Sequence, residues 1–284
     1  MTFWIGFCVL TLGLARPPAA SGHADLLALI DIVTKKIESD PKNAALYLKR
    51  GELYRVHADW KMAESDFDRV AQLDPKLDAV DFCRGKLCFE SGQNERARAL
   101  LDKYLAGQPD HVDALMTRAR LLLKLGERKA AANDFTQAIA KASDPMAEYF
   151  LERAQAQADD GELEAAVRGL DEGLKRLGPL VGLELYAIDL ELAHKDFDGA
   201  LKRLETISAR SERKEKWLAR RGEILVLAGR RDEAKISFVA ALAAIESLPP
   251  RLRQTPAMLD LKKRVNGALA AGIGSSKSDA SGKK

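Results

Sequence analysis

Four histidines are the residues of this chain best suited to bind a metal ion or to transfer protons. They lie in distant parts of the sequence, and none has another histidine or a cysteine four residues away, the spacing at which one helix presents two ligands. No set of catalytic residue types is clustered in the sequence either. The sequence therefore predicts no enzyme, no catalytic residue, no metal site and no cofactor. The histidines are His23, His57, His111 and His194.

Cys83 and Cys88 are the cysteines that could form a disulfide or a redox pair in the body of the chain. They lie on one predicted helix, where five residues place the side chains about 140° apart, too far for an unstrained disulfide. We expect two thiols that pack as small apolar residues. A redox role is the alternative. Cys8 lies early in an apolar run, where a lipid-attachment cysteine is not expected.

The elements that would position any functional side chain recur about every 34 residues. The stretch from Ala44 to Pro75 predicts two helices joined by a polar turn, and the proline ends the second helix. An alanine, a large apolar residue four places later and a turn glycine return with this period, with Ala58 and Lys195 in place of two glycines. The alanines are Ala63, Ala97, Ala131, Ala166, Ala200 and Ala234, and the apolar residues are Phe67, Leu101, Phe135, Leu170, Leu204 and Phe238.

A small residue twelve places before each alanine completes the pattern, as Gly51, Gly85, Ala119, Ala154 and Gly222, with Ile188 as the exception. These columns, with proline near the end of each period, resemble the tetratricopeptide repeat over roughly residues 26 to 248. The resemblance implies an all-α, right-handed superhelical solenoid of about six helix hairpins. The fifth hairpin matches least well, because it has Ile188 and lacks the proline. The hairpins are expected to begin near Ala44, Asp78, Val112, Ala147, Val181 and Glu215, within an array over residues 44–248.

Both ends of the array are predicted to be covered by single helices. Residues 25–41 form an amphipathic pattern in register with the second half of a repeat, which can cap the stack. Residues 249–271 predict a capping helix with Thr255 as N-cap and Pro256 at the first helical position. Its apolar residues are Leu259, Leu261, Val265 and Leu269. Residues 272–284 are rich in Gly, Ser and Lys and are predicted to be disordered; they lack the spacing and context of a phosphate-binding loop.

Residues 1–24 differ in composition from the rest of the chain. Phe3 to Ala15 is an apolar run of 13 residues, shorter than the roughly 20 that cross a bilayer. We predict a cleaved secretory signal, hence export to the periplasm or cell envelope and no stable membrane insertion after cleavage. The run has no Lys or Arg before it, so an uncleaved anchor is the alternative. The small residues that offer cleavage sites are Ala20, Gly22 and Ala24.

Arginine recurs one position before the small-residue column, where the repeat family more often has an apolar residue. In two hairpins an aspartate occupies the facing position of the second helix. We predict the ion pairs Arg50–Asp66 and Arg118–Asp134 across these hairpins. The alternative is a ladder of arginines that faces solvent and binds anions. The arginines are Arg50, Arg84, Arg118, Arg153 and Arg221.

The resemblance also implies which residues line the inner groove, formed by the first helices. Apolar residues there suit an amphipathic helix or an extended segment of a partner. The column that carries Asn in family members binding a C-terminal carboxylate holds other residues here, which argues against that type of ligand. The alternative is that the groove residues only pack between neighbouring helices. The predicted groove residues are Leu48, Glu52, Arg55, Phe82, Lys86, Phe89, Met116, Arg120, Leu123, Leu151, Gln155, Leu185 and Asp189.

The function expected from the sequence is a non-enzymatic scaffold that binds a protein or peptide. The net charge is only +3, from 45 basic and 42 acidic residues, so no general nucleic-acid binder is expected. The second hypothesis is an accessory subunit of an envelope enzyme or of a secretion or assembly machine, held through the outer face or the C-terminal tail. The oligomeric state and the identity of the partner stay open.

Overall fold

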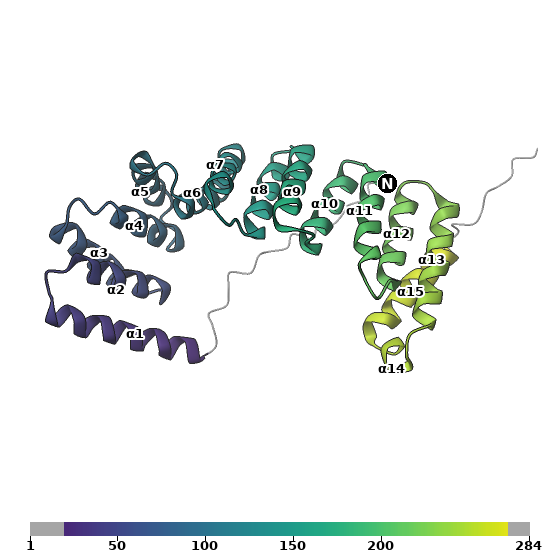
Figure 1. The fold of residues 1–284 in the computed structure, drawn as a ribbon, viewed down its shortest axis with the longest axis horizontal. Coiled ribbons are helices and arrows are strands. Elements are labelled where there is room, and N and C mark those ends of the chain that lie inside the picture. Colours follow the sequence, from purple (N-terminus) through teal and green to yellow (C-terminus); the bar gives the residue numbers. More distant parts are fainter. Residues whose placement is uncertain (1–19, 272–284) are drawn as a thin grey trace, which may run out of the picture. The chain divides into compact units, whose positions relative to one another are not determined.

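The computed structural model describes residues 20–271, which fold into α-helices joined by short turns (Figure 1). The chain divides after Pro109 into two compact units, a division that the regular period does not predict. In the first unit, a single helix precedes two antiparallel helix pairs. These helices are α1 (Ala20–Ser39), α2 (Ala44–Val56), α3 (Trp60–Leu73), α4 (Ala79–Glu90) and α5 (Asn94–Gly107).

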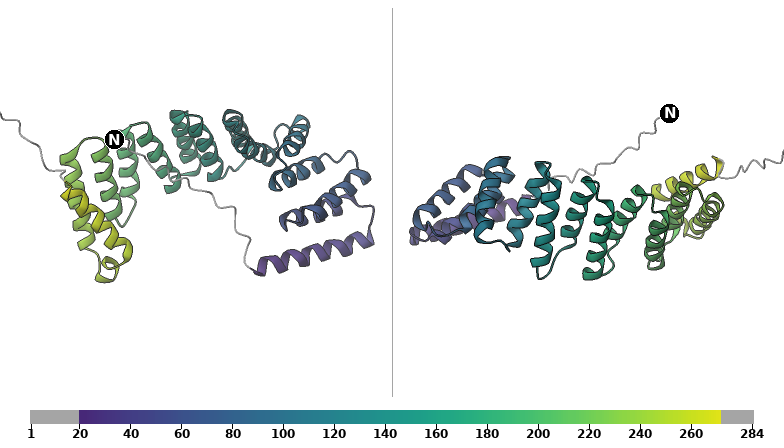
Figure 2. Two further views of the ribbon diagram at one scale, coloured as in Figure 1. Left: turned by 180° about the vertical axis from the view of Figure 1, so that it is seen from behind. Right: turned by 90° about the horizontal axis from the view of Figure 1, so that it is seen from above.

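The second unit contains four helix pairs followed by two further helices (Figure 2). The pair that matches the repeat least well, α10 with α11, still forms an antiparallel hairpin. The helices are α6 (Val112–Lys124), α7 (Arg128–Lys141), α8 (Ala147–Asp159), α9 (Leu163–Leu177), α10 (Val181–Ala193), α11 (Phe197–Ala209), α12 (Glu215–Leu227), α13 (Arg231–Glu246), α14 (Pro250–Arg253) and α15 (Pro256–Ala270).

Each helix pair turns through one residue with a positive φ angle. Glycine occupies this position in four pairs, because it adopts the left-handed conformation without a steric penalty. Ala58 and Lys195 take it in the other two, with φ of 62° and 64°. The common backbone geometry explains why glycine recurs in this column and why two exceptions are tolerated at exposed turns.

The small-residue columns allow the two helices of a pair to approach closely. A Cβ atom on Gly51 would lie 2.5 Å from the Phe67 ring, and one on Gly222 would lie 2.6 Å from Phe238. The alanines of the second helices, from Ala63 to Ala234, are completely buried. Each pair therefore has its own core, in which one large apolar side chain fills the space that two small ones leave.

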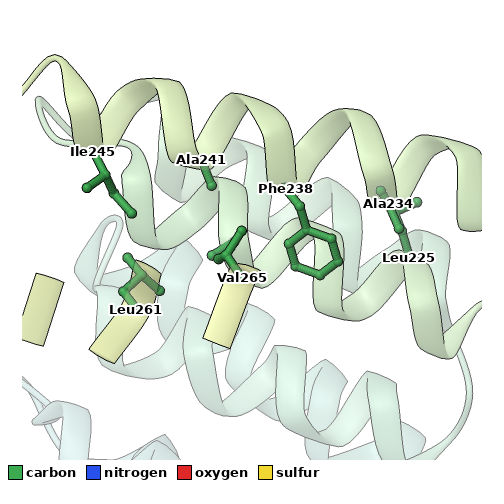
Figure 3. Close-up of a cluster of buried hydrophobic side chains, with 8 residues drawn as sticks. Leu225, Ala234, Phe238, Ala241, Ile245, Leu261 and Val265 are labelled. Carbon is green, nitrogen blue, oxygen red and sulfur yellow. The ribbon is translucent and has the colours of Figure 1, made fainter. Parts of the chain in front are cut away.

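The C-terminal helix α15 covers the last pair, α12 and α13, as Figure 3 shows. Leu261 and Val265 are buried against Phe238, Ala241 and Ile245. The helix begins at Pro256 after Thr255, as predicted.

One expected contact of α15 is wrong. Leu259 is 54% exposed, and Met258 and Leu269 pack against the cluster in addition to the buried pair. The predicted apolar face of this helix is therefore one residue out of phase in its first turn, where Met258 rather than Leu259 faces the cluster. The short helix α14, between the array and α15, was not predicted.

At the other end, α1 packs against α2 through Ile30, Val33 and Ile37, which are buried. The helix begins at Ala20, five residues before the predicted start at Asp25. The predicted signal or anchor at residues 1–24 lies mostly outside the described residues, as does the predicted disordered tail at 272–284. Within residues 20–271, no helix is both long and apolar enough to cross a membrane.

Candidate functional site

The two ion pairs predicted inside the hairpins are present. Arg50 donates from Nε and Nη2 to the two carboxylate oxygens of Asp66, each at 2.8 Å. Arg118 binds Asp134 in the same two-pronged manner, at 2.7 and 2.9 Å. Both aspartates are buried. The fork geometry matches the carboxylate and leaves neither oxygen without a donor.

The remaining arginines of the column also bond within the array, so the alternative of a solvent-facing anion ladder is wrong. Arg153 is buried and donates to the carbonyl oxygen of Gly169 at 2.9 Å and to Glu172 at 2.8 Å. Arg221 donates to Ser237 Oγ at 2.7 Å. The remaining member pairs with acidic residues of the preceding second helix, namely Arg84 with Asp68 and Glu64.

The fifth helix pair reverses the direction of this contact. Ala187 occupies the arginine position on α10, and Arg203 stands at the facing position on α11. Its guanidinium group donates to Glu191 at 2.6 Å and to Asp171 at 2.7 Å, and it lies 4.0 Å from Glu184. The weakest copy of the repeat therefore keeps an arginine between its helices by supplying it from the other side.

Glu191 is buried with an incomplete set of partners. Burial raises the pKa of its carboxyl above the ordinary value, and the hydrogen bond from Arg203 offsets the effect only in part. Its Oε2 atom has no hydrogen-bond partner. One arginine shared between three carboxylates is too little positive charge to hold Glu191 firmly in its ionised form.

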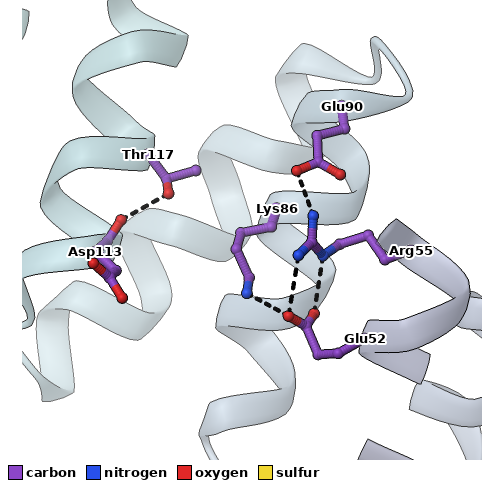
Figure 4. A network of polar contacts seen from close by, with 6 residues as sticks. All are labelled: Glu52, Arg55, Lys86, Glu90, Asp113 and Thr117. Carbon is purple, nitrogen blue, oxygen red and sulfur yellow. Dashed lines mark hydrogen bonds and ion pairs between the residues drawn. The ribbon is translucent and has the colours of Figure 1, made fainter. Parts of the chain in front are cut away.

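In the first unit, three predicted groove residues bind one another in an ion network (Figure 4). Glu52 accepts from Arg55 Nε at 3.1 Å and from Lys86 Nζ at 2.5 Å. Arg55 reaches across to Glu90 on α4. Burial alone would raise the pKa of Glu52, but the bonds and charges of Arg55 and Lys86 outweigh it and lower that pKa. The network joins α2 to α4 and leaves these charges occupied with one another.

The apolar groove residues of the array differ in how much surface they present. Phe82 is 8% exposed, stacks on Tyr104 at 5.3 Å between ring centroids and carries Lys86 Nζ 4.6 Å from its own centroid. Met116 is 2% exposed. These two side chains pack in the interior and offer little surface to a partner. The other predicted apolar groove residues of these repeats are half-buried, namely Leu48, Phe89, Leu123 and Leu151.

In the second unit, the charged and polar groove residues link consecutive first helices. Arg120 on α6 donates to Glu152 on α8, with Nε 2.9 Å from Oε2. Tyr186 on α10 donates to Gln155 on α8 at 2.8 Å. The same pattern continues as Arg220 to Asp189 at 3.2 Å, and from the capping helix as Arg264 to Glu223 at 2.8 Å.

The sequence predicted one residue of each of the first three links, Arg120, Gln155 and Asp189, but not the residue that each of them bonds. The missed residues, Glu152, Tyr186 and Arg220, lie 31 or 32 positions from their partners. A recurring polar pair at slightly less than one repeat length is the signal that could have revealed them. The links show that the predicted groove positions of α8 and α10 lie on neighbouring helices.

The face that α8 and α10 share is apolar and acidic. Leu185 is 37% exposed, and Asp159 and Asp189 are exposed near it along the same two helices. Burial raises the pKa of the Tyr186 hydroxyl to about 12, and the charges of Asp159 and Asp189 add to the shift. The surface thus combines an exposed aliphatic side chain with two exposed carboxylates, of which Asp189 also pairs with Arg220.

The residues that first suggested chemistry do not form a reactive site among residues 24–271. Cys83 and Cys88 are free and buried, as expected. Burial raises the pKa of the Cys83 thiol to about 12, so the reactive thiolate is disfavoured. No group of three or more His, Cys, Asp or Glu side chains in the described part of the chain is arranged to hold a metal ion.

Comparison with known proteins agrees with this architecture. Residues 88–149 match the family model described as tetratricopeptide repeat. The fold superimposes with a TM-score of 0.60 on the C-terminal part of a tetratricopeptide repeat protein from Cytophaga hutchinsonii, at 14% identity, over 85% of this chain and 95% of that one. Residues 88–149 are thus a match to the tetratricopeptide repeat, and the fold of the other helix pairs is similar to that of tetratricopeptide repeat proteins. The helix pairs of this chain are its sequence repeats, and the residues at their facing positions are the repeat columns described above.

Two further similarities concern this repeat array. PilW, described as a widely conserved type IV pilus biogenesis factor, superimposes with a TM-score of 0.55 at 21% identity, over 68% of this chain and 90% of PilW. In sequence, cellulose synthase operon protein C of Pseudomonas fluorescens is 32% identical over 174 residues, which are 58% of this chain. The match spans only 14% of the length of that relative.

Proposed function

We propose that this protein is a non-enzymatic scaffold of the cell envelope that binds a segment of another protein on the face shared by α8 and α10. The observation that carries the proposal is the exposed Leu185 between exposed carboxylates of both helices. A segment with aliphatic side chains flanked by Lys or Arg complements this surface. Tetratricopeptide repeat proteins generally act by holding other proteins, which agrees with the proposal.

The choice of this face follows from the differences among the predicted groove residues. Phe82 and Met116 are buried, and the Glu52 network binds its own charges. On α8 and α10, by contrast, Gln155, Leu185 and Asp189 remain exposed. A binding site needs side chains that can exchange water for a partner, and these residues meet that condition.

Location in the envelope is proposed from the apolar run between Phe3 and Ala15. Its length and the small residues after it are typical of a secretory signal. Mass spectrometry of the protein purified from its own cells tests this proposal. Loss of about the first 24 residues supports a cleaved signal, by the rule for small residues at cleavage sites, whereas an intact N-terminus in the membrane fraction supports the anchor.

A second candidate function is that of an accessory subunit held through its outer face. Ile236 and Val239 on α13 are 67% and 52% exposed. The same two positions hold small or polar residues in the other five repeats, such as Ser65 and Asp68 in the first repeat. The name of the Pseudomonas fluorescens relative, cellulose synthase operon protein C, supports an accessory role beside a polysaccharide-synthesising enzyme.

A matched pair of variants separates the two surfaces. Leu185→Glu and Val239→Glu make the same chemical change at exposed positions of α10 and α13, so neither disturbs a core. Both variants and the wild type would carry a photo-crosslinking residue at Gln155, on the face of Leu185, or in a second set at Ile236, on the face of Val239. All would be irradiated in envelope preparations. Circular dichroism checks that the helices are retained.

We expect Leu185→Glu to abolish a specific crosslinked protein and Val239→Glu to retain it. The reverse result would favour the accessory-subunit function. If both variants keep the partner, neither surface binds it, and the proposed site is wrong. Synthetic peptides of equal length that are apolar and basic, or apolar and acidic, then provide a binding test of the charge argument on the purified protein.

A further inference from the structure

The N-terminal helix α1 exposes a face whose central position is buried in every complete repeat of this chain. Leu29 and Ile32 are 47% and 49% exposed. In the repeat register Leu29 corresponds to the alanine column, whose six members have no exposed surface. Among residues 20–271 no first helix covers this face, because α1 corresponds to the second half of a repeat and is the first described helix. In Figure 1, α1 accordingly lies at the edge of the first unit, beside α2.

Four of the exposed residues of α1 form a regular stripe. Asp25, Leu29, Ile32 and Lys36 are separated by four, three and four residues, so they lie on the same side of the helix. All of them are exposed. The buried residues Ile30, Val33 and Ile37 occupy the adjacent side and pack on α2. The stripe is therefore not required for the folding of the first unit and is available for a contact.

The stripe is complementary to itself when two copies run antiparallel. A twofold axis midway between Leu29 and Ile32 places Leu29 of one copy against Ile32 of the other. The same axis places Asp25 of one copy against Lys36 of the other, twice. Isologous contacts of this kind are the commonest way in which identical chains associate. Apolar contacts at the centre and opposite charges at both ends are typical of a specific antiparallel helix pair.

We propose that α1 is a self-association surface, on which α1 of a second copy of this chain packs antiparallel through this stripe. A first helix of the same chain cannot cover the stripe in the way that first helices cover second helices in the repeats. Wherever the chain forms a hairpin, the alanine column permits the close approach of its first helix, and Leu29 is too large for that approach. In addition, α1 is helical from Ala20 onward, through the positions at which the other repeats turn back.

The contact is small, so the association is weak. It centres on two aliphatic side chains per copy, less than the roughly 800 Å² per partner that a standard interface buries. We expect a dissociation constant of about 10 µM or weaker by the usual relation between interface size and affinity. Charge pairs at both ends then set the antiparallel orientation more than they add affinity.

Sedimentation velocity of the full chain between about 1 and 200 µM tests the proposal in the expected affinity range. The wild type should shift from monomer to dimer across this range. Ile32→Asp should raise the dissociation constant at least about tenfold, because it buries a charge at the centre of the contact. Ile236→Asp, an equal change at an exposed position of α13, is the matched control and should leave the dimer unchanged.

Charge reversal distinguishes the proposed geometry from nonspecific association. Asp25→Lys and Lys36→Asp alone should each weaken the dimer about three- to tenfold, since each creates two like-charge contacts. The double variant should restore the wild-type dissociation constant to within about twofold, because the pairs are formed again with opposite polarity. A double variant as weak as the single ones would overturn the antiparallel pairing.

A photo-crosslinking residue at Leu29 identifies what covers the stripe. A crosslink to α1 of a second chain supports the proposal. A crosslink within one chain to residues 3–15, or a wild type that stays monomeric over the whole concentration range, overturns it. Because these measurements use the purified protein alone, their outcome does not depend on the binding of another protein to α8 and α10.

Discussion

Two glutamates, the half-buried Glu52 in the first unit and the buried Glu191 in the second, show how the surroundings decide what a carboxylate does in this fold. Glu52 in the first unit accepts hydrogen bonds from both Arg55 and Lys86, and its pKa is lowered. Glu191 in the second unit shares Arg203 with Asp171, and its pKa is raised. Each side chain lies on the first helix of its own repeat, Glu52 on α2 and Glu191 on α10. They differ in the number of cationic partners: Glu52 has two, and Glu191 shares one with another carboxylate.

This difference has a thermodynamic meaning. A buried carboxylate with two cationic partners is stabilised in its ionised form, so folding favours loss of its proton. A carboxylate with one shared partner keeps part of its desolvation cost, so folding favours retention of the proton. The two glutamates should therefore make stability depend on pH in opposite directions.

The largest effect is expected when Arg203 is removed. Arg203→Met leaves the buried Glu191 without its cationic partner, while Glu184 keeps Arg210 at 3.4 Å. The substitution should lower the free energy of unfolding by about 3 to 5 kcal/mol. Urea unfolding followed by circular dichroism measures this change. The control is Arg230→Met, since Arg230 pairs with Asp198 and Glu233 at the surface. That variant should change stability far less, because solvent screens the pair.

If Arg203→Met were no more destabilising than the control, the reversed contact of the fifth repeat would have no structural importance. Glu191, whose pKa is raised, would then be protonated or hydrated in the folded protein at neutral pH. Repeating the unfolding measurement at acidic pH would separate these explanations, because protonation removes the unpaired charge.

A smaller loss is expected from Glu52→Gln. The amide keeps the shape of the side chain but loses the charge that binds Arg55 and Lys86, which should cost about 1 to 2 kcal/mol at neutral pH. Asp189→Asn is the matched control, because Asp189 pairs with Arg220 at an exposed position. Its effect should stay within about 0.5 kcal/mol.

The Glu52 contribution should disappear in acid. Its folded-state pKa lies below the ordinary value of 4.5, so the stabilisation is complete above that value and is lost as the pH falls through the lowered pKa. Thermal unfolding of wild type and Glu52→Gln should therefore converge below about pH 4, the range in which free glutamate gains its proton. A constant difference down to the acid limit would show that the charge is not the source of the stabilisation.

The smallest effect, with the opposite sign, is expected from Glu191→Gln. At neutral pH this variant should be within about 1 kcal/mol of wild type or slightly more stable, because it removes a poorly compensated buried charge. The folded-state pKa is raised, so wild-type stability relative to the variant should increase as the pH falls from that raised pKa toward 4.5. A wild type that loses stability relative to Glu191→Gln in this range would contradict the raised pKa.

Sequence determined the parts of the molecule that depend on neighbours within one hairpin. The alanine, glycine and large apolar columns predicted the helix pairs, because a period of 34 residues repeats the same short-range packing problem. The pairs Arg50–Asp66 and Arg118–Asp134 were predicted for the same reason: sixteen residues separate each pair, and the hairpin turn brings these positions together. The register also placed Ala58 and Lys195 at the turn position, and both adopt the positive φ angle that glycine has there in the other pairs.

Only the tertiary structure decided what depends on the packing of one hairpin against the next. The predicted groove positions supplied Glu52, Phe82 and Met116 as candidates of the same kind. Their surroundings made the first an ion-network residue and buried the other two. The partners Glu152 and Tyr186 come from the next repeat, and the angle between repeats selects them. That angle results from many side-chain volumes acting together, which a periodic pattern of residue types does not encode.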